Sequence, residues 1–207
     1  MTKLDDGSIF VAMKKRDKKA EIIAIGVELI SLNGYNATGI DAILKKAGVP
    51  KGSFYHYFSS KEDFGLAVIA HFAAQYDEKL DGFLADLAVS PCRRIRNYLE
   101  AGLLNLTENR FQKGCLIGNL GQELADQNER FRASLATIFG GWTEKFSDCI
   151  RQAQQDGELR LGTDPDVMAD FILSGWEGAL LRAKVMKSSI PLTNFIETLF
   201  ATVLESA

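Results

Sequence analysis

Residues 37–61 read ATGIDAILKKAGVPKGSFYHYFSSK, and this stretch decides the fold. Thr38, followed three residues later by the carboxylate of Asp41, has the pattern of a capping box, which predicts the start of a short helix. Gly48 predicts the end of that helix, because glycine readily takes the left-handed conformation that closes a helix. A second short helix is expected from Lys51 through the aromatic run that follows. Two short helices joined by a glycine-containing turn are typical of a helix-turn-helix.

The segments on either side are also helical by pattern. From Asp17 to Ile30, apolar residues recur at three- and four-residue spacing, which predicts a helix with one buried stripe, and Gly34 ends it. Gly26 lies inside that helix at a cost of roughly 1 kcal/mol relative to alanine, so we expect a close contact with another helix there. Further along, three of the remaining helices are expected to begin at prolines, since proline fits a first helical turn: Pro91, Pro165 and Pro191.

These patterns predict an all-α protein of about nine helices. Residues 1–13 are expected to be a flexible tail, residues 14–61 a three-helix helix-turn-helix domain, and residues 62–207 a helical ligand-binding and dimerisation domain. Hydrophobic residues make up 46% of the chain, which is enough to form a core in both domains. No apolar run approaches the ~20 residues that cross a bilayer, so we expect no membrane partner.

Charge is unevenly distributed along the chain. Residues 1–61 hold ten Lys and Arg against six Asp and Glu, a net charge of +4. The whole chain has 24 basic and 27 acidic side chains, so residues 62–207 hold 14 and 21, a net charge of −7. A basic N-terminal segment on an acidic body fits an end that binds nucleic acid. A solvated lysine run between Lys14 and Lys19 explains the same numbers, so charge alone does not decide.

Residues that enzymes and metal sites need are scarce. The three cysteines are widely spaced, and the two histidines are His56 and His71, so no metal motif, disulfide framework or cysteine–histidine pattern is formed. The chain also lacks a glycine-rich phosphate loop and a G-x-S-x-G motif. We therefore expect no enzyme, no metal and no cofactor. Unpaired cysteines and an N-terminus without a signal-peptide pattern favour the cytoplasm.

The stretch ending at Lys61 resembles the DNA-binding domain of TetR-family transcriptional regulators. The resemblance implies that a recognition helix enters the major groove of operator DNA with its first residues toward the bases. Small residues at that helix start let the backbone approach, and free amide groups there attract phosphate. Tyrosine hydroxyls and the terminal lysine are expected to bind phosphate, which positions the protein. The matching segments are Gly34-Tyr35, Thr38, Ala47-Gly48-Val49, Lys51-Gly52-Ser53, Phe54-Tyr55-His56-Tyr57-Phe58 and Ser60-Lys61. The candidate DNA-binding residues are Thr38, Lys51, Gly52, Ser53, Tyr55, His56, Tyr57 and Lys61.

Within the aromatic run, Phe54 and Phe58 are expected to pack against the first helix. His56 either packs under the turn or reaches a phosphate, and the sequence leaves both placements open. The resemblance further implies a homodimer formed by the last two long helices, residues 164–186 and 191–205. Two-fold symmetry suits DNA, because two recognition helices must lie about 34 Å apart to reach successive major grooves.

One segment of the C-terminal half has a narrower resemblance. KGCLIGNL at residues 113–120 and GALLRAK at residues 178–184 are similar to a branch of the family that includes electrophile-sensing, N-ethylmaleimide-responsive repressors. That resemblance implies a reactive pair, Cys115 and Lys184. A thiolate is the species that electrophiles modify, and a nearby ammonium lowers the pKa of a thiol. A lone cysteine is more often a small buried apolar residue, and Cys92 and Cys149 are read that way.

The expected function is a DNA-binding regulator, by analogy a repressor, that a small apolar or electrophilic effector releases from DNA. A reversible ligand is favoured over modification of Cys115, since most cysteines are inert. A helical adaptor that binds protein is the more distant alternative, and DNA binding that weakens with salt would separate the two. Candidate side chains for an apolar effector cavity are Tyr98, Phe111, Trp142, Phe146 and Trp176.

Overall fold

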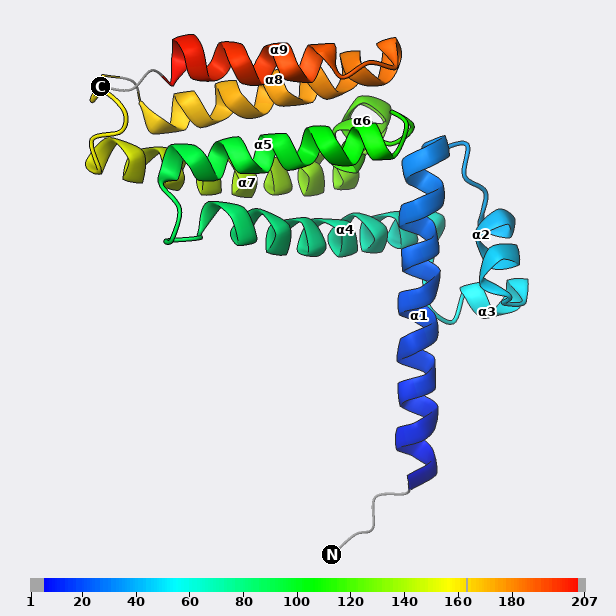
Figure 1. Ribbon diagram of the computed structural model, residues 1–207. Coiled ribbons are helices and arrows are strands. Elements are labelled where there is room, and N and C mark those ends of the chain that lie inside the picture. The colour runs from blue at the N-terminus through cyan, green and yellow to red at the C-terminus, as the bar shows by residue number, and fades with distance from the viewer. Residues whose placement is uncertain (1–5, 163, 205–207) are drawn as a thin grey trace, which may run out of the picture. The chain divides into compact units, whose positions relative to one another are not determined.

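The computed structural model describes residues 6–162 and 164–204, with side chains from residue 18 onward. Nine α-helices followed by one π-helical turn make up this part of the chain, which confirms the all-α prediction (Figure 1). In chain order they are α1 (Asp6–Asn33), α2 (Ile40–Ala47), α3 (Lys51–Phe54), α4 (Lys61–Leu84), α5 (Pro91–Glu108), α6 (Leu116–Leu124), α7 (Glu129–Gln155), α8 (Pro165–Met186), α9 (Ile190–Thr198) and the π-helical turn (Leu199–Val203).

The chain divides into two compact units, Met1–Phe72 and Ala73–Ala207, with the division inside α4. The sequence placed the domain boundary earlier, at residue 61. Helix α1 already begins at Asp6, so residues 6–13, expected as a flexible tail, are helical. After Gly7 this segment contains no glycine or proline that would stop the helix from extending toward the N-terminus. The first five residues of the expected tail lie outside the described residues.

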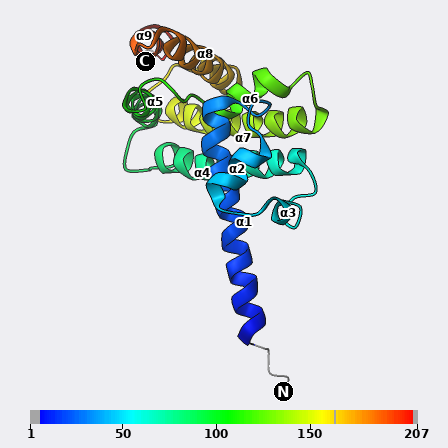
Figure 2. The ribbon, with the colours of Figure 1, turned by 90° about the vertical axis from the view of Figure 1, so that its right-hand side faces the viewer.

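In the first unit, α2 lies against α1 and is followed by α3 (Figure 2). Helix α1 packs closely on the start of α4 at Gly26, as the sequence predicted. A Cβ atom at this position would collide with the ring of Phe64 and lie 2.8 Å from Cγ2 of Val68. Gly26 therefore sets the distance between the two helices, and its cost to helix propensity is offset by packing.

The two short helices differ in detail from the expected ones. Helix α2 begins after Gly39, which caps it without a side-chain hydrogen bond, so the predicted capping box is wrong. Gly48 does end α2 in the left-handed region, with φ of 61°. Helix α3 stops at Phe54, although a helix was expected through the whole aromatic run. Turns replace its last part, and in them the Tyr57 N–H donates to the Phe54 carbonyl. The turn allows Phe54 and Phe58 to point into the same core.

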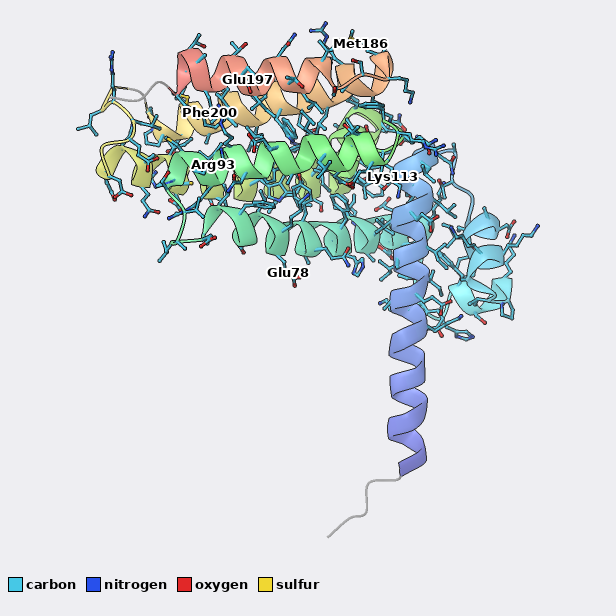
Figure 3. The ribbon with its side chains drawn as sticks, in the orientation of Figure 1. Glu78, Arg93, Lys113, Met186, Glu197 and Phe200 are labelled. Atoms are coloured by element: carbon cyan, nitrogen blue, oxygen red, sulfur yellow. The ribbon has the colours of Figure 1, made fainter. Side chains whose placement is uncertain are left out.

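The second unit is a layered bundle of long helices. Helix α7 packs against α5, α6 and α8, and α9 lies beside α8 and contacts α5 (Figure 1). Trp176 of α8 is at the centre, fully buried, where the backbone of Gly102 on α5 comes so close that a Cβ atom there would lie 2.5 Å from the indole ring. On α4, Glu78 points away from these layers into solvent (Figure 3).

None of the helices in the described part of the chain is long and apolar enough to cross a membrane.

Candidate nucleic-acid interface and small-molecule site

The exposed side of the helix-turn-helix is built around the start of α3. Pro50 precedes the helix in an extended conformation. Within α3, the N–H of Ser53 is the first that bonds inside the turn, and it donates to the Pro50 carbonyl. Lys51 and Gly52 are exposed, and Ser53 is half-buried. A helix start with small, exposed residues lets a backbone come close to a duplex and presents amide groups to an anion.

The aromatic run separates into a buried and an exposed set. Phe54 and Phe58 are buried, and both pack edge-on against Phe64 of α4, with ring centroids 5.6 and 5.0 Å apart. The two rings are tilted against each other at 5.2 Å. The sequence predicted packing against the first helix, whereas these ring contacts are made with α4. Tyr55 is 60% exposed and His56 is also exposed. His56 therefore does not pack under the turn, which removes one of its two expected placements.

Lys51 is already paired within the protein. Its Nζ lies 2.9 Å from a carboxylate oxygen of Asp41 on α2, and both side chains are exposed. The hydrogen bond to Asp41 and the charge of its carboxylate raise the pKa of Lys51. A DNA phosphate would therefore compete with Asp41 for this ammonium.

Two of the expected DNA-binding side chains are held by the protein. The side chain of Thr38 is only 3% exposed, and its hydroxyl donates to the carbonyl of Gly34 at 2.6 Å. Lys61 lies at the start of α4 with its Nζ 4.5 Å from the ring centre of Tyr35 and 3.4 Å from the Asn36 carbonyl. Thr38 thus fixes the backbone that leads into α2. Lys61 and the partly buried Tyr57 keep polar atoms near the surface.

In the second unit, the structure brings together four of the five aromatic candidates. Tyr98 contacts Phe146 and Trp176 with ring centroids 5.3 and 6.4 Å apart, and all three rings are buried. Trp142 joins this group through Tyr76 of α4, whose ring lies 4.6 Å away. These side chains form a packed core, so a ligand would have to displace them.

Phe111 is separate from that core. It follows α5 with φ of 56°, next to Arg110 with φ of 52°, and its carbonyl accepts a hydrogen bond from Lys187 at 2.9 Å. Two successive non-glycine residues in the left-handed region are strained and persist only where neighbouring contacts hold them. This strained turn lies between α5 and α6 in the chain, and its hydrogen bond to Lys187 ties it to the residue that follows α8.

Cys115 caps the start of α6, where its Sγ accepts a hydrogen bond from Gly118 N–H at 3.4 Å. Lys184 lines the same small pocket, of about 10 Å³, together with Glu177. Burial is the main reason why the pKa of Cys115 is raised well above its usual value, and the charge of Glu177 adds to it. This direction is opposite to the lowering that the sequence analysis expected from a nearby ammonium. The other two thiols behave similarly, since burial raises the pKa of Cys149 to about 11 and of Cys92 to about 12.

Sequence reasoning missed two polar residues of this region, Tyr76 and Glu177. The hydroxyls of Tyr76 and Tyr98 lie 2.6 Å apart, and burial raises the pKa of both. Glu177 follows buried Trp176 in α8 and is half-buried, and burial raises the pKa of its carboxyl group. A carboxylate next to an inward-facing tryptophan was the only available signal, and periodicity alone does not tell which way it points.

Comparison with known proteins gives the same architecture. Residues 22–68 match the family "Bacterial regulatory proteins, tetR family", and residues 91–199 match "Tetracyclin repressor-like, C-terminal domain". The chain is a TetR-family transcriptional regulator. It is 41% identical over 177 residues to the transcriptional regulator AcuR of Cereibacter sphaeroides, covering 86% of this chain and 81% of AcuR.

Two further relatives of this TetR-family chain are named repressors. The repressor DhaR of Mycobacterium sp. strain GP1 is 34% identical over 194 residues, covering 94% of this chain and 96% of DhaR. The structure of reduced Escherichia coli NemR aligns with a TM-score of 0.81 at 30% identity, covering 89% of this chain and 96% of that one. The likeness therefore extends over both units.

Proposed function

We propose that this TetR-family chain is a cytoplasmic, dimeric transcriptional repressor that a small molecule releases from operator DNA. The observation that carries the proposal is the exposed start of α3, where Lys51, Gly52 and Ser53 follow a left-handed turn at Gly48. Two relatives that share both units are named repressors, which favours repression over activation. No residue is assigned a catalytic role.

In the proposed complex, the first turn of α3 enters the major groove. Gly52 and Ser53 let the helix approach the base edges, and Lys51 exchanges Asp41 for a phosphate or a base. The hydroxyls of Tyr55 and Tyr57, the ring of His56 and the ammonium of Lys61 bind phosphates beside the groove. Thr38 acts indirectly, because its buried hydroxyl fixes the chain before α2.

The dimer surface is proposed on α8. Residues spaced alternately by four and three places along this helix are exposed, which is the pattern of a seam between packed helices. The apolar members are strongly exposed for large side chains, up to 75% for Val185. A second copy would cover this stripe by two-fold symmetry and form a bundle with α9. The stripe consists of Val167, Phe171, Ser174, Gly178, Leu181 and Val185.

A dimerisation test compares two exposed residues of the same kind. Leu181→Asp places a charge in the proposed seam and should give monomers in sedimentation velocity. Leu161→Asp is the matched control, because Leu161 is also exposed but lies in the turn before α8. A dimer that survives Leu181→Asp unchanged would place the interface elsewhere.

The effector is proposed to bind reversibly in the second unit, near the Tyr98 core and the start of α6. Modification of Cys115 is the second candidate function. It is favoured by the position of this thiol at the cap of α6, beside a strained turn, and disfavoured by burial, which keeps the thiol protonated.

The decisive test is a gel shift with duplex DNA flanking the gene, backed by selection from random duplexes. Binding should weaken steeply as salt rises, because neutralised phosphates release counterions. Lys51→Ala should weaken binding by about tenfold or more, as expected for a base or phosphate contact. Arg132→Ala is the control, since Arg132 forms a similar exposed ion pair, with Glu129 of α7. If neither duplex source yields salt-dependent binding, the proposal fails.

A further inference from the structure

A carboxylate of α8 lies against the start of α6. Glu177 of α8 reaches the first turn of α6 at Gly118, where a Cβ atom would collide with its Oε2. A side chain of any size at position 118 would thus displace the carboxylate. Gly118 provides the space that lets Glu177 meet the cap of α6.

Cys115 is the group that Glu177 meets there. Glu177 Oε2 and, at 3.7 Å, the Cβ atom of Cys115 both lie next to the position that a Gly118 Cβ atom would take. The Cys115 sulfur accepts a hydrogen bond from Gly118 N–H at 3.4 Å. The two side chains line one small pocket with Gly114 and Lys184. The Lys184 stem comes within 3.9 Å of where a Gly114 side chain would begin. An ammonium and a carboxylate therefore both lie near the thiol, and the charge of Glu177 adds to the rise of the Cys115 pKa that burial causes.

We propose that Glu177 is a positioning residue that holds Cys115 as a protonated, unreactive thiol while α6 and α8 are in contact. A carboxylate acceptor binds S–H and repels a thiolate, so attack by Cys115 requires that Glu177 first move away or take up a proton. Any ligand that separates Glu177 from Gly118 exposes and activates the thiol. This deepens the second candidate function, and its test involves no DNA, so it fails or succeeds separately from operator binding.

Iodoacetamide is a suitable small probe of the thiol. Sγ forms a bond to the methylene carbon, the carbon–iodine bond breaks, iodide leaves, and the thiol proton passes to solvent or to Glu177. The three cysteines fall in separate tryptic peptides, 80–93, 114–130 and 146–151, so mass spectrometry follows each rate in one sample. Cys149, buried and bonded to the Pro91 carbonyl at 3.4 Å, reports whether a variant is still folded.

Two variants remove the carboxylate from Cys115 in different ways. Glu177→Gln keeps the shape and removes the charge, and Gly118→Ala keeps the charge and forces it away. In both, Cys115 should react on the order of tenfold faster near neutral pH, the change in thiolate that one pKa unit gives. Asp170→Asn is the control, because it removes an exposed carboxylate from the same helix.

A pH series separates this role from loosened packing. The titratable groups around the thiol are Glu177 and Lys184 on α8, Tyr76 on α4 and Tyr98 on α5. In Glu177→Gln the rise of the Cys115 rate with pH should begin at lower pH than in the wild type, while Cys149 stays slow. A Cys115 rate within about twofold of wild type in both variants, or a slower one in Glu177→Gln, would overturn the proposal. If Cys149 reacts fast in Glu177→Gln, that variant has lost its packing, and the Cys115 rate in Gly118→Ala then tests the proposal.

Discussion

The two units of the chain handle polar groups in opposite ways. The first unit keeps its charges at the surface, where Lys51 pairs with Asp41, and fills its core with Phe54, Phe58 and Phe64. The second unit places hydroxyl, thiol and carboxyl groups inside, among tyrosine and tryptophan rings. A surface that binds a fixed polyanion needs a rigid apolar base beneath it. Buried polar groups are costly when they lose their partners, so a ligand that takes over one of those partners would change the packing of this unit.

The largest effect is expected from removing a ring of the aromatic core of the first unit. Phe54→Ala should lower the free energy of unfolding by about 3–5 kcal/mol, because a fully buried ring leaves a cavity, and it should abolish DNA binding. Chemical denaturation measures the loss, and hydrogen exchange should locate it in residues 18–72. Loss of less than about 1 kcal/mol would show that the first unit does not depend on this cluster.

A smaller effect tests the buried polar groups. Tyr98→Phe removes the 2.6 Å hydrogen bond to the Tyr76 hydroxyl and should cost about 1–3 kcal/mol, since that hydroxyl stays partly buried. The double variant Tyr76→Phe/Tyr98→Phe removes both hydroxyls and should recover part of the loss. Additive costs in the double variant would contradict a direct pairing.

The buried thiols predict a dependence of stability on alkaline pH. Burial raises the pKa of Cys149 to about 11 in the folded protein, whereas the unfolded thiol titrates near its ordinary value. Above that value the unfolded chain loses its proton first, so stability present at lower pH falls as pH rises toward the folded pKa. Between pH 8 and pH 10, wild type should lose about 1 kcal/mol more than Cys149→Ser, which does not titrate at this position. Urea titrations at the two pH values measure the free energy of unfolding of each protein. Equal losses in wild type and Cys149→Ser would exclude this effect.

The smallest effect on stability is expected at the DNA surface. Asp41→Asn should leave the free energy of unfolding unchanged within error, because both members of the ion pair are exposed. It should strengthen DNA binding several-fold, since Lys51 no longer has to leave a carboxylate and a negative charge is removed. Gel shifts at two salt concentrations measure this gain. Weaker binding would mean that Asp41 orients Lys51 toward DNA.

The sequence predicted more of the first unit than of the second, because local residues determine more of its features. Turn chemistry and aromatic spacing located the helix-turn-helix, including the close contact at Gly26, because local residues determine these features. The capping role of Thr38 was wrong, since its hydroxyl bonds backward to Gly34, a choice that depends on the tertiary path. The environment of Cys115 was also misjudged. Glu177 lies 62 positions away in the sequence and meets the thiol only because Gly118 leaves space.

Three consecutive residues of α8 face three different surroundings. Trp176 lies in the core, Glu177 meets α6, and Gly178 lies in the exposed stripe. Each α-helical residue turns by about 100°, so a small rotation of α8 that frees Glu177 also shifts the position of Gly178. In a two-fold dimer that uses this stripe, the same rotation would shift the surface that the neighbouring subunit contacts. The expected outcome is a cooperative dose–response, with a Hill coefficient above one for the effector.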